Sequence, residues 1–219
     1  MLDFFYRIIA LTAIFYLFPL IIVIFILSYI NQGSPCFFSQ VRVGKDFKEF
    51  TFYKFRTMRN KIGGNLFTIS GDNRITRFGR ILRKFKIDEL PQLWNVVKGD
   101  IEFVGPRAEV KEYVDEINFA FLRHIKPGIT DFSSIILRNE ESVLRKIGGD
   151  SCYKQLLPIK LKLIEIYAMH KNISLDIEII FLTILSIFFP DKAQTIVLEK
   201  FINKNNYRLY TTIKSLMEL

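Results

Sequence analysis

The sequence is poor in the residues that build disulfides and transition-metal sites. Its 219 residues contain two cysteines, Cys36 and Cys152, and two histidines, His124 and His170, and they include no internal repeat or low-complexity segment. The cysteines are far apart and form no Cys-x-x-Cys pair, so a reduced, cytoplasmic state is the simpler assumption. There is no His/Cys cluster for zinc or iron. Any bound metal should therefore be a hard cation held by oxygen atoms.

Charge is absent from a long N-terminal run. No charged residue lies between Ile8 and Ile30, and this stretch is long enough to cross about 30 Å of hydrocarbon as a helix. A cleavable signal peptide is the competing interpretation. The run exceeds the apolar core of such peptides, roughly 7 to 15 residues, and no clean small-residue cleavage site follows it. We predict that residues 1–30 form a membrane anchor.

A proline lies near the middle of this run. Pro19 removes one backbone hydrogen bond and clashes with the preceding turn. The result could be a kinked spanning helix, or a helix that breaks at Phe18-Pro19 and leaves the bilayer on the side where it entered. Sequence physics does not choose between them, because the freed backbone groups can be satisfied in either arrangement.

The rest of the chain is strongly basic. The net charge is +9, and residues 1–30 contain only Asp3 and Arg7, so the whole net charge belongs to residues 31–219. The positive-inside tendency places this part in the cytoplasm, and attraction to an anionic leaflet would hold it near the membrane. Nucleic acid could explain the same charge, so charge alone does not identify the partner.

Local patterns predict an α+β domain that is mostly helical with a small β-hairpin. Residues 37–43 and 49–55 carry β-branched and aromatic residues around a Gly-Lys-Asp turn, which is typical of a hairpin. The period of two would place Lys54 and Arg56 on one face. Residues 60–73 have the composition of a loop.

Further along, helices alternate with one extended run. Residues 126–139 are expected to begin with a Pro-Gly turn and to continue as an extended apolar run. The run at 177–189 is short and carries Glu178, so a buried or interfacial helix is expected rather than a second span. Residues 191–219 give no clear functional signal. The other expected helices lie at 109–123, at 140–146 and from Pro158 onward.

Basic residues recur at every third position from Arg74 to Lys86, with apolar residues between them. On an ideal helix this spacing drifts by about 60° per step, so the five cations cannot share one face. The stretch would suit a membrane interface or phosphate groups. An ordinary solvated helix with snorkelling cations is the alternative.

Two adjacent carboxylates, Asp88 and Glu89, follow this basic stretch and precede Leu90-Pro91. This is a usual way to begin a helix, so Asp88 could be an N-cap and Glu89 a favourable first-turn charge. Consecutive helical residues point about 100° apart, so the pair should have two different tasks rather than grip one atom. Nearby cations would hold Asp88 ionised, as a nucleophile or a magnesium ligand must be.

A carboxylate nucleophile in so cationic a setting would attack a phosphate, whose charge must first be neutralised. The candidate cations are Lys54, Arg56, Arg107 and Arg138. The Gly105-Pro106 turn would fix the backbone path that leads to Arg107. Arginine suits phosphate because its planar donors engage two oxygens at once. Solvated edge-strand cations and a surface arginine after a turn are the alternatives.

Together these residues resemble the bacterial sugar transferase family, the monotopic phosphoglycosyl transferases. The matching pieces lie at 42–58, 74–107 and 126–130, and the order KFRTM, DELPQLWNV, VGPR is the specific part. The resemblance covers roughly residues 1–190. It favours a re-entrant anchor over residues 1–30 with its break at Phe18-Pro19, followed by a cytoplasmic catalytic domain over 31–190. Residues 191–219 are left as a tail of unknown role.

The resemblance implies an enzyme that transfers a sugar 1-phosphate from a UDP-sugar to polyprenyl (undecaprenyl) phosphate and releases UMP, with magnesium as cofactor. Asp88 would be the nucleophile, would form a covalent phosphosugar intermediate and would contact the magnesium. Glu89 would be its partner, orienting it or handling a proton. The other implied roles are diphosphate neutralisation by Lys54, Arg56 and Arg107, a phosphate or nucleotide contact by Arg138, and shaping of the site by Gln92, Asn95 and Pro106.

The implied location is the bacterial inner membrane, with the catalytic domain on its cytoplasmic face. Anionic lipid is a further expected partner, and nucleic acid is not. A rival from another class is a membrane-tethered basic adaptor that binds acidic lipid or nucleic acid without catalysis. The sequence does not identify the sugar, the glycan pathway or the oligomeric state.

The sequence departs from the family pattern in two places. DFSSI at 131–135 stands where the family often has Gly-Trp-Ala-Gln-Val, and GPRAE at 105–109 replaces Gly-Pro-Arg-Pro. The first change bears on the nucleotide or sugar pocket. Neither change touches the Asp-Glu pair.

Overall fold

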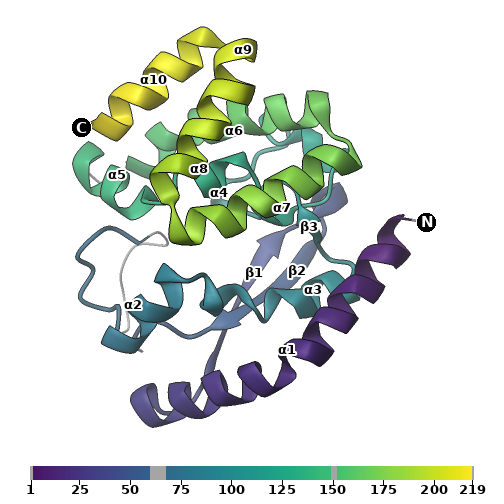
Figure 1. Ribbon diagram of the computed structural model, residues 1–219, viewed down its shortest axis with the longest axis vertical. Coiled ribbons are helices and arrows are strands. Elements are labelled where there is room, and N and C mark those ends of the chain that lie inside the picture. The colour runs from purple at the N-terminus through teal and green to yellow at the C-terminus, as the bar shows by residue number, and fades with distance from the viewer. Residues whose placement is uncertain (1, 60–67, 149–151, 219) are drawn as a thin grey trace.

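The computed structural model describes residues 2–59, 68–148 and 152–218. Figure 1 shows the long helix α1 along one side, the strands β1 and β2 with α2 and α3 beside it, and the helices α4 to α10 beyond them. The predicted α+β fold, mostly helical with small sheets and an N-terminal apolar helix, is confirmed. The loop predicted at 60–73 lies largely outside the described residues.

Helix α1 (Leu2–Gln32) is a single element of 31 residues, so its length is about 46 Å at 1.5 Å per residue. It is long and apolar enough to cross a membrane. Helical structure continues through Phe18 and Pro19, so the helix does not end at the expected break, and Figure 1 shows α1 as one bent helix. A proline removes one bond of the helical ladder, and the helix can bend at that point without ending.

Both ends of α1 contact the globular body. Near its start, Lys126 Nζ donates to Asp3 Oδ2 at 2.6 Å. At its end, Gln32 Nε2 donates to the Arg56 carbonyl at 2.9 Å. The helix therefore lies along the body instead of projecting from it. Its large exposed apolar side chains include Phe4, Phe5, Leu11, Phe15, Tyr16, Val23 and Ile30.

The predicted hairpin is confirmed. Strands β1 (Phe37–Val43) and β2 (Glu49–Phe55) pair antiparallel over their whole length, with Phe37 opposite Phe55. The turn between them is closed by a hydrogen bond from the Gly44 amide to the Lys48 carbonyl at 2.8 Å.

A second sheet is small and parallel. Strand β3 (Glu102–Val104) pairs with β4 (Gly128–Thr130). Gly128 in β4 and Gly105, which follows β3, approach each other closely, since a Cβ on Gly128 would lie 2.2 Å from the Gly105 amide nitrogen. The Val104-Gly105-Pro106 path is thus pressed against the Pro-Gly turn, as a tight backbone path before Arg107 requires.

Three short elements follow the hairpin and carry the acidic pair. Helix α2 (Arg77–Lys84) begins at Thr76, whose hydroxyl accepts from the Gly79 amide at 2.8 Å. After it, a 3-10 turn (Ile87–Glu89) leads into α3 (Gln92–Lys98). The basic stretch is therefore helical in its central part.

Helix α2 packs tightly against the Thr57 backbone at Gly79. A Cβ at this position would lie 2.1 Å from the Thr57 carbonyl oxygen, which belongs to a backbone that cannot swing away. We expect Gly79→Ala to lower the free energy of unfolding by about 1 to 3 kcal/mol, the range for overpacking. Thermal unfolding in detergent measures this. Arg80→Ala, exposed on the same helix, is the control and should leave the unfolding temperature almost unchanged.

The helix predicted at 109–123 is wrong. The segment forms two 3-10 turns, at Lys111–Tyr113 and Ala120–Arg123. The reason lies between them, where Asp115 Oδ1 accepts from the amides of Ile117 and Asn118 at 3.1 and 2.8 Å. An aspartate whose carboxylate accepts hydrogen bonds from the amides of the residues that follow it favours a turn over a continuous helix.

The extended run predicted after the Pro-Gly turn is correct only for β4. The chain then forms helix α4 (Phe132–Ile136). Asp131 caps this helix, because its carboxylate accepts from the Ser134 amide at 2.7 Å. A short helix that buries Phe132, Ile135 and Ile136 is hard to distinguish from a strand in the sequence, because either element can bury an apolar run.

The later helices are confirmed in existence, but two of them begin earlier than predicted, at residues 152 and 173 instead of 158 and 177. Helix α5 (Glu140–Ile147) matches its prediction, and α7 (Ile173–Phe188) buries one face and exposes the other. Helix α6 (Cys152–His170) begins six residues before Pro158, which lies inside it. Burial of Tyr153 and Leu156 in the core stabilises this first part despite the proline.

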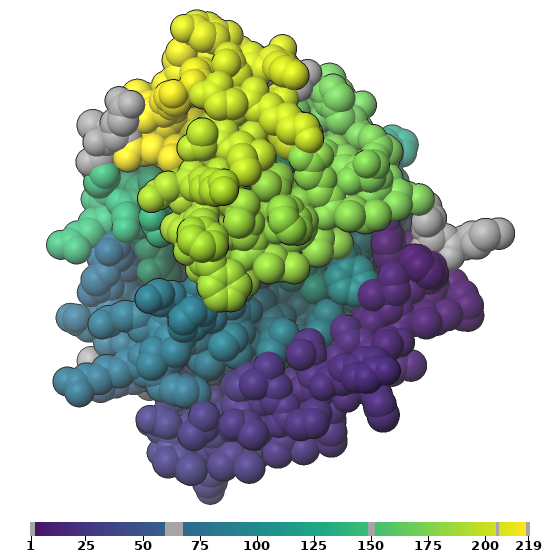
Figure 2. Space-filling view, viewed as in Figure 1, coloured from purple at the N-terminus to yellow at the C-terminus, as the bar shows by residue number. Residues whose placement is uncertain are grey.

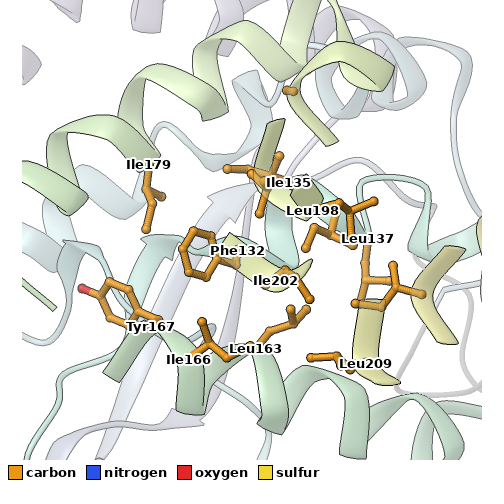
Figure 3. Close-up of a cluster of buried hydrophobic side chains, with 14 of the residues drawn as sticks. Phe132, Ile135, Leu137, Leu163, Ile166, Tyr167, Ile179, Leu198, Ile202 and Leu209 are labelled. Carbon is orange, nitrogen blue, oxygen red and sulfur yellow. The ribbon is translucent and has the colours of Figure 1, made fainter. Parts of the chain in front are cut away.

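The C-terminal segment belongs to the main hydrophobic core. It forms α8 (Pro190–Val197), a π-helical turn (Leu198–Ile202), α9 (Asn203–Asn205) and α10 (Tyr207–Glu218). Figure 3 shows side chains from α4, α6 and α7 gathered with Leu198, Ile202 and Leu209 in one cluster. The segment after residue 190, for which the sequence gives no functional signal, thus helps to support helix α4.

Candidate active site

A cleft of about 550 Å³ lies between the hairpin, the Ile87–Glu89 turn and helices α4 to α6. Ten basic side chains and five acidic ones line it, so an anion would find it attractive. The basic residues are Arg42, Lys54, Arg56, Arg59, Arg74, Arg83, Lys86, Arg107, Arg138 and Lys160. The acidic residues are Asp88, Glu89, Glu109, Glu140 and Glu141.

Asp88 lies in the wall of this cleft and is 6% exposed. It is not the N-cap of α3, because Pro91 holds that position without a side-chain cap. The turn that presents Asp88 follows Lys86, whose backbone is left-handed with a φ of 56°. A left-handed non-glycine residue costs free energy, and such residues cluster at functional sites.

Glu89 is held by an arginine. Arg107 Nη2 donates to Glu89 Oε1 at 3.1 Å, and both side chains are largely buried. Burial alone would raise the pKa of Glu89, but the charges of Lys86, Arg107 and Lys54 outweigh it and lower that pKa to about 2. The same pairing raises the pKa of the Arg107 guanidinium. Glu89 is therefore ionised throughout the physiological range.

The pKa of Asp88 moves in the opposite direction. Burial and the negative charge of Glu89 raise it, and the positive charges of Lys54, Arg83 and Lys86 offset this only in part. The sequence predicts that nearby cations hold Asp88 ionised, and in the structure these cations offset only part of the upward shift of its pKa. Neighbouring carboxylates whose pKa values are driven apart can take different roles, and separate roles for Asp88 and Glu89 stay a prediction.

Lys54 extends from β2 into the cleft and is half-buried. Its Nζ lies 5.3 Å from the centroid of the Phe38 ring. Burial lowers the pKa of Lys54 to about 8, although the nearby charge of Asp88 opposes this change. The structure thus brings together Asp88, Glu89, Lys54 and Arg107 as the sequence predicted.

Arg56 and Arg138 also line the cleft, but their guanidinium groups hold other parts of the protein. Arg56 donates to the carbonyls of residues 32–34 at the end of α1, including the Gly33 oxygen at 2.8 Å. Arg138 donates to the Lys84 carbonyl at 2.6 Å, at the end of α2. The Arg56 guanidinium is thus placed to hold the anchor and the Arg138 guanidinium to hold α2, and both are less suited to bind phosphate directly.

The three residues expected to shape the site are buried behind it. The Asn95 amide donates to the Thr51 carbonyl at 2.7 Å and accepts from the Tyr53 amide at 3.2 Å, so it ties α3 to β2. The Pro106 carbonyl accepts from the Gly128 amide at 2.9 Å. Gln92 is 1% exposed. These contacts fix the elements that carry Lys54 and Arg107.

Sequence reasoning assigned no role to several charged or hydroxyl side chains of the cleft, among them Arg42, Glu109, Glu140, Tyr153 and Lys160. For Lys160 a signal existed, since it lies on the buried apolar face of α6 four residues after Leu156. A lone lysine in such a row is unusual unless it has partners. Arg42 and Glu109 stood inside the motif segments but were assigned no role.

The residues of this site could offer one carboxylate to a magnesium ion. Within the described ranges no group of three or more His, Cys, Asp or Glu residues could hold a metal ion. Magnesium is commonly bound by one or two carboxylates together with substrate phosphates. Asp88 could supply that carboxylate, since Glu89 is engaged by Arg107.

Comparison with known proteins gives a consistent result. A family model described as bacterial sugar transferase matches residues 1–190. A UDP-N-acetylgalactosamine-undecaprenyl-phosphate N-acetylgalactosaminephosphotransferase of Aeromonas hydrophila is 42% identical over 125 residues, which cover 54% of this chain and 30% of the relative.

Two further relatives differ in how much of their length is matched. A UDP-glucose:undecaprenyl-phosphate glucose-1-phosphate transferase of Xanthomonas campestris is 36% identical over 186 residues, covering 81% of this chain and 36% of the relative. An uncharacterized sugar transferase of Bacillus subtilis is 41% identical over 137 residues, covering 61% of this chain and 68% of the relative. The match to the Aeromonas and Xanthomonas proteins thus spans about a third of their length.

Proposed function

This chain belongs to the bacterial sugar transferase family, and from that premise we propose that it transfers a sugar 1-phosphate from a UDP-sugar to undecaprenyl phosphate and releases UMP. The reaction would start the membrane stage of glycoconjugate or exopolysaccharide synthesis, at the cytoplasmic face of the bacterial inner membrane. One observation carries the proposal. A buried aspartate, Asp88, lies among cations in a cleft whose second carboxylate, Glu89, is already paired with an arginine.

In the proposed first step, an ionised Asp88 oxygen attacks the phosphorus that bears the sugar. A bond forms between this oxygen and phosphorus, the bond from phosphorus to the oxygen shared with the α-phosphate breaks, and UMP leaves with that electron pair. In the second step a phosphate oxygen of undecaprenyl phosphate attacks the same phosphorus and releases the Asp88 carboxylate. The product is a polyprenyl-diphosphate sugar.

The cations of the cleft give these steps their feasibility. Attack of one anion on another requires that the charge on the phosphate be neutralised in the transition state. Lys54 and Arg107 supply positive charge near the acidic pair, since Lys54 interacts electrostatically with both carboxylates and Arg107 with Glu89. Glu89, ionised and bonded to Arg107, keeps that guanidinium in place. Magnesium, when bound by Asp88 and the diphosphate, would add charge neutralisation.

The test of this proposal is UMP release by the full-length protein in detergent or lipid particles. The assay contains undecaprenyl phosphate, magnesium and one UDP-sugar at a time, and a parallel reaction contains EDTA. We expect UMP from one donor class, and its loss with EDTA. If folded protein gives no UMP with any donor, the transferase assignment fails and the membrane-tethered adaptor becomes the better description.

The exposed apolar side chains support the membrane location. In addition to α1, helix α7 exposes Ile173, Ile177, Phe181, Ile184 and Phe188, and α2 exposes Arg77, Arg80 and Lys84. Figure 2 shows α1, α2 and α7 on one face of the molecule. Apolar helices with basic neighbours suit the interface of an anionic leaflet.

The contacts at both ends of α1 favour a re-entrant anchor. A spanning helix has its ends about 30 Å apart across the hydrocarbon, on opposite sides of the membrane. Here Asp3 and Gln32 both bond to the same body, at Lys126 and Arg56. We infer that the bent helix enters and leaves on the cytoplasmic side.

Cysteine labelling tests the topology. Single cysteines placed at residue 2 and at Asn31 should both react with a membrane-impermeant maleimide in inverted vesicles and stay unreacted in intact spheroplasts. The unmodified protein is the background control, because Cys36 and Cys152 are both buried. Reaction at residue 2 from outside would contradict re-entry and indicate a spanning helix.

The pH dependence of kcat/KM should be bell-shaped, because the reaction needs ionised Asp88 and protonated Lys54. The acid limb should lie above the ordinary aspartate pKa, since the Asp88 pKa is raised. The alkaline limb should lie at about 8, where free Lys54 loses its charge. Lys54→Arg keeps the cation and should move that limb to higher pH. An unmoved limb would assign it to another group.

A further inference from the structure

A charged network lies in the cleft on the side of α6, apart from the Asp-Glu pair. Lys160 is 4% exposed, and its Nζ donates to Glu109 Oε1 at 3.1 Å, Glu140 Oε1 at 3.2 Å and the Tyr153 hydroxyl at 2.8 Å. Two carboxylates thus face one ammonium group. Arg42 also acts electrostatically on Glu109, and Arg107 acts on both carboxylates, but a carboxylate can accept more hydrogen bonds than the single one that each receives from Lys160.

This network adjoins two aromatic rings. The ring centroids of Tyr113 and Tyr153 are 4.6 Å apart, and both residues line the cleft. An aromatic ring offers an apolar surface to the C–H groups of a sugar ring, and a carboxylate accepts hydrogen bonds from its hydroxyl groups. A pocket with apolar walls and a few fixed polar groups is typical of a small-molecule site.

Arg42 lines the same cleft and interacts electrostatically with Glu109 and Arg107. Its Nη2 donates to Gln40 Oε1 at 3.3 Å, and its other terminal nitrogen donates to the Ala108 carbonyl. Its buried Nε has no hydrogen-bond partner in the part of the chain that the structure describes. Such an orphaned donor in a cleft wall indicates a missing acceptor.

Arg107 lies within electrostatic range of both the acidic pair and the network. Arg107 interacts electrostatically with Glu89 on the one hand and with Glu109 and Glu140 on the other. A diphosphate held at Asp88 and Arg107 would therefore present one of its two substituents to the network. Because Lys160 is already paired with both carboxylates, a neutral group rich in hydroxyls suits this network better than a phosphate.

We propose that Glu109, Glu140, Tyr113 and Tyr153, arranged around Lys160, form the subsite that binds a sugar ring of the UDP-sugar donor. Lys160 acts as a positioning residue, because its three donors fix both carboxylates and the Tyr153 hydroxyl. The inference rests on the proposed transferase function. The ring is either the transferred sugar or the ribose of the uridine, since both offer neighbouring hydroxyl groups.

The experiment measures binding, so that it does not depend on turnover. The full-length Asp88→Asn protein in detergent is titrated with UDP-sugars and separately with UMP, with and without Glu140→Gln. Glu140 is suitable because its side chain is partly exposed at 27%, and glutamine keeps its shape. The matched control is Glu165→Gln, which lies on α6 and pairs with the exposed Lys162. Thermal unfolding checks that every variant is folded.

We expect Glu140→Gln to raise the Kd for the preferred UDP-sugar by about 10- to 100-fold, as loss of a charged hydrogen bond does. An unchanged Kd for UMP assigns the subsite to the transferred sugar, and an equal rise for UMP assigns it to the ribose. An unchanged Kd for both ligands overturns the proposal, as does an equal effect of Glu165→Gln. Failure of the transferase function itself would appear separately, as wild-type protein that binds UDP-sugar but releases no UMP.

Discussion

Asp88→Asn is expected to abolish UMP release, with a loss of about 10⁴-fold or more, as removal of a covalent nucleophile typically causes. Asparagine keeps the size of the side chain but replaces one carboxylate oxygen with an NH2 group and offers no carboxylate to attack phosphorus. Asp88 is buried without serving as the cap of α3, so the change should leave the unfolding temperature close to that of the wild type. The measurement is UMP release with the donor that the wild type prefers.

A control and a mechanistic companion make this result specific. Asp191→Asn changes an exposed aspartate of α8 and should retain full activity. With a radiolabelled sugar donor and no acceptor lipid, wild-type protein should retain label through denaturation, and the Asp88→Asn protein should not. Undiminished UMP release by Asp88→Asn would remove Asp88 from the mechanism and favour the adaptor interpretation.

Arg107→Met is expected to have the second largest effect, through activity and stability together. Loss of a charge that stabilises the transition state typically lowers kcat by about 10²- to 10³-fold. The change also leaves Glu89 buried without its arginine, and breaking a buried pair costs about 3 to 5 kcal/mol. Because each side chain keeps some exposure, 25% for Arg107 and 11% for Glu89, we expect the lower end of that range.

A double variant separates the two contributions. In Arg107→Met with Glu89→Gln, the unpaired charge is gone, so most of the lost stability should return while activity stays low. The measurements are the unfolding temperature and kcat for both single variants and the double variant. If activity recovered together with stability, Arg107 would act by holding the fold and not by neutralising the diphosphate.

The sequence predicted the local elements of the fold where a residue pattern decides them. The hairpin at 37–55 follows from alternating aromatic and β-branched residues around a turn, and α1 from its uninterrupted apolar run. The failures occurred where a side chain bonds the nearby backbone. Asp115 turns a segment expected to be helical, and Asp131 begins a helix in a segment expected to be extended.

The site was predictable to the extent that it lies in short motifs. Asp88, Glu89, Lys54 and Arg107 meet in one cleft as expected. The direction of the Asp88 pKa was not foreseen, because it depends on burial that only the folded chain defines.

Other parts of the site depend on contacts between distant segments, which no local pattern shows. Arg56 looked like a phosphate ligand but bonds the end of α1, 22 to 24 residues earlier in the chain. Lys160 meets Glu109 from 51 residues away. In each case the bonding partner is set by how the segments pack, so the side chain's task could not be read from its neighbours in the sequence.

The hydrogen bonds from Arg56 to the carbonyls of residues 32–34 also fix where the residues beside Arg56 lie relative to the end of α1. Lys54 precedes Arg56 by two residues, which is about 7 Å along an extended chain. If α1 is the membrane anchor and Asp88 the nucleophile, as proposed, Lys54 in the same cleft is fixed only a short step from the point where the anchor leaves the bilayer. An acceptor phosphate at the headgroup level would reach it while its isoprenoid tail stayed in the lipid. Tail length should then matter little to the rate once the acceptor is membrane-bound, and the depth of the headgroup layer should matter more.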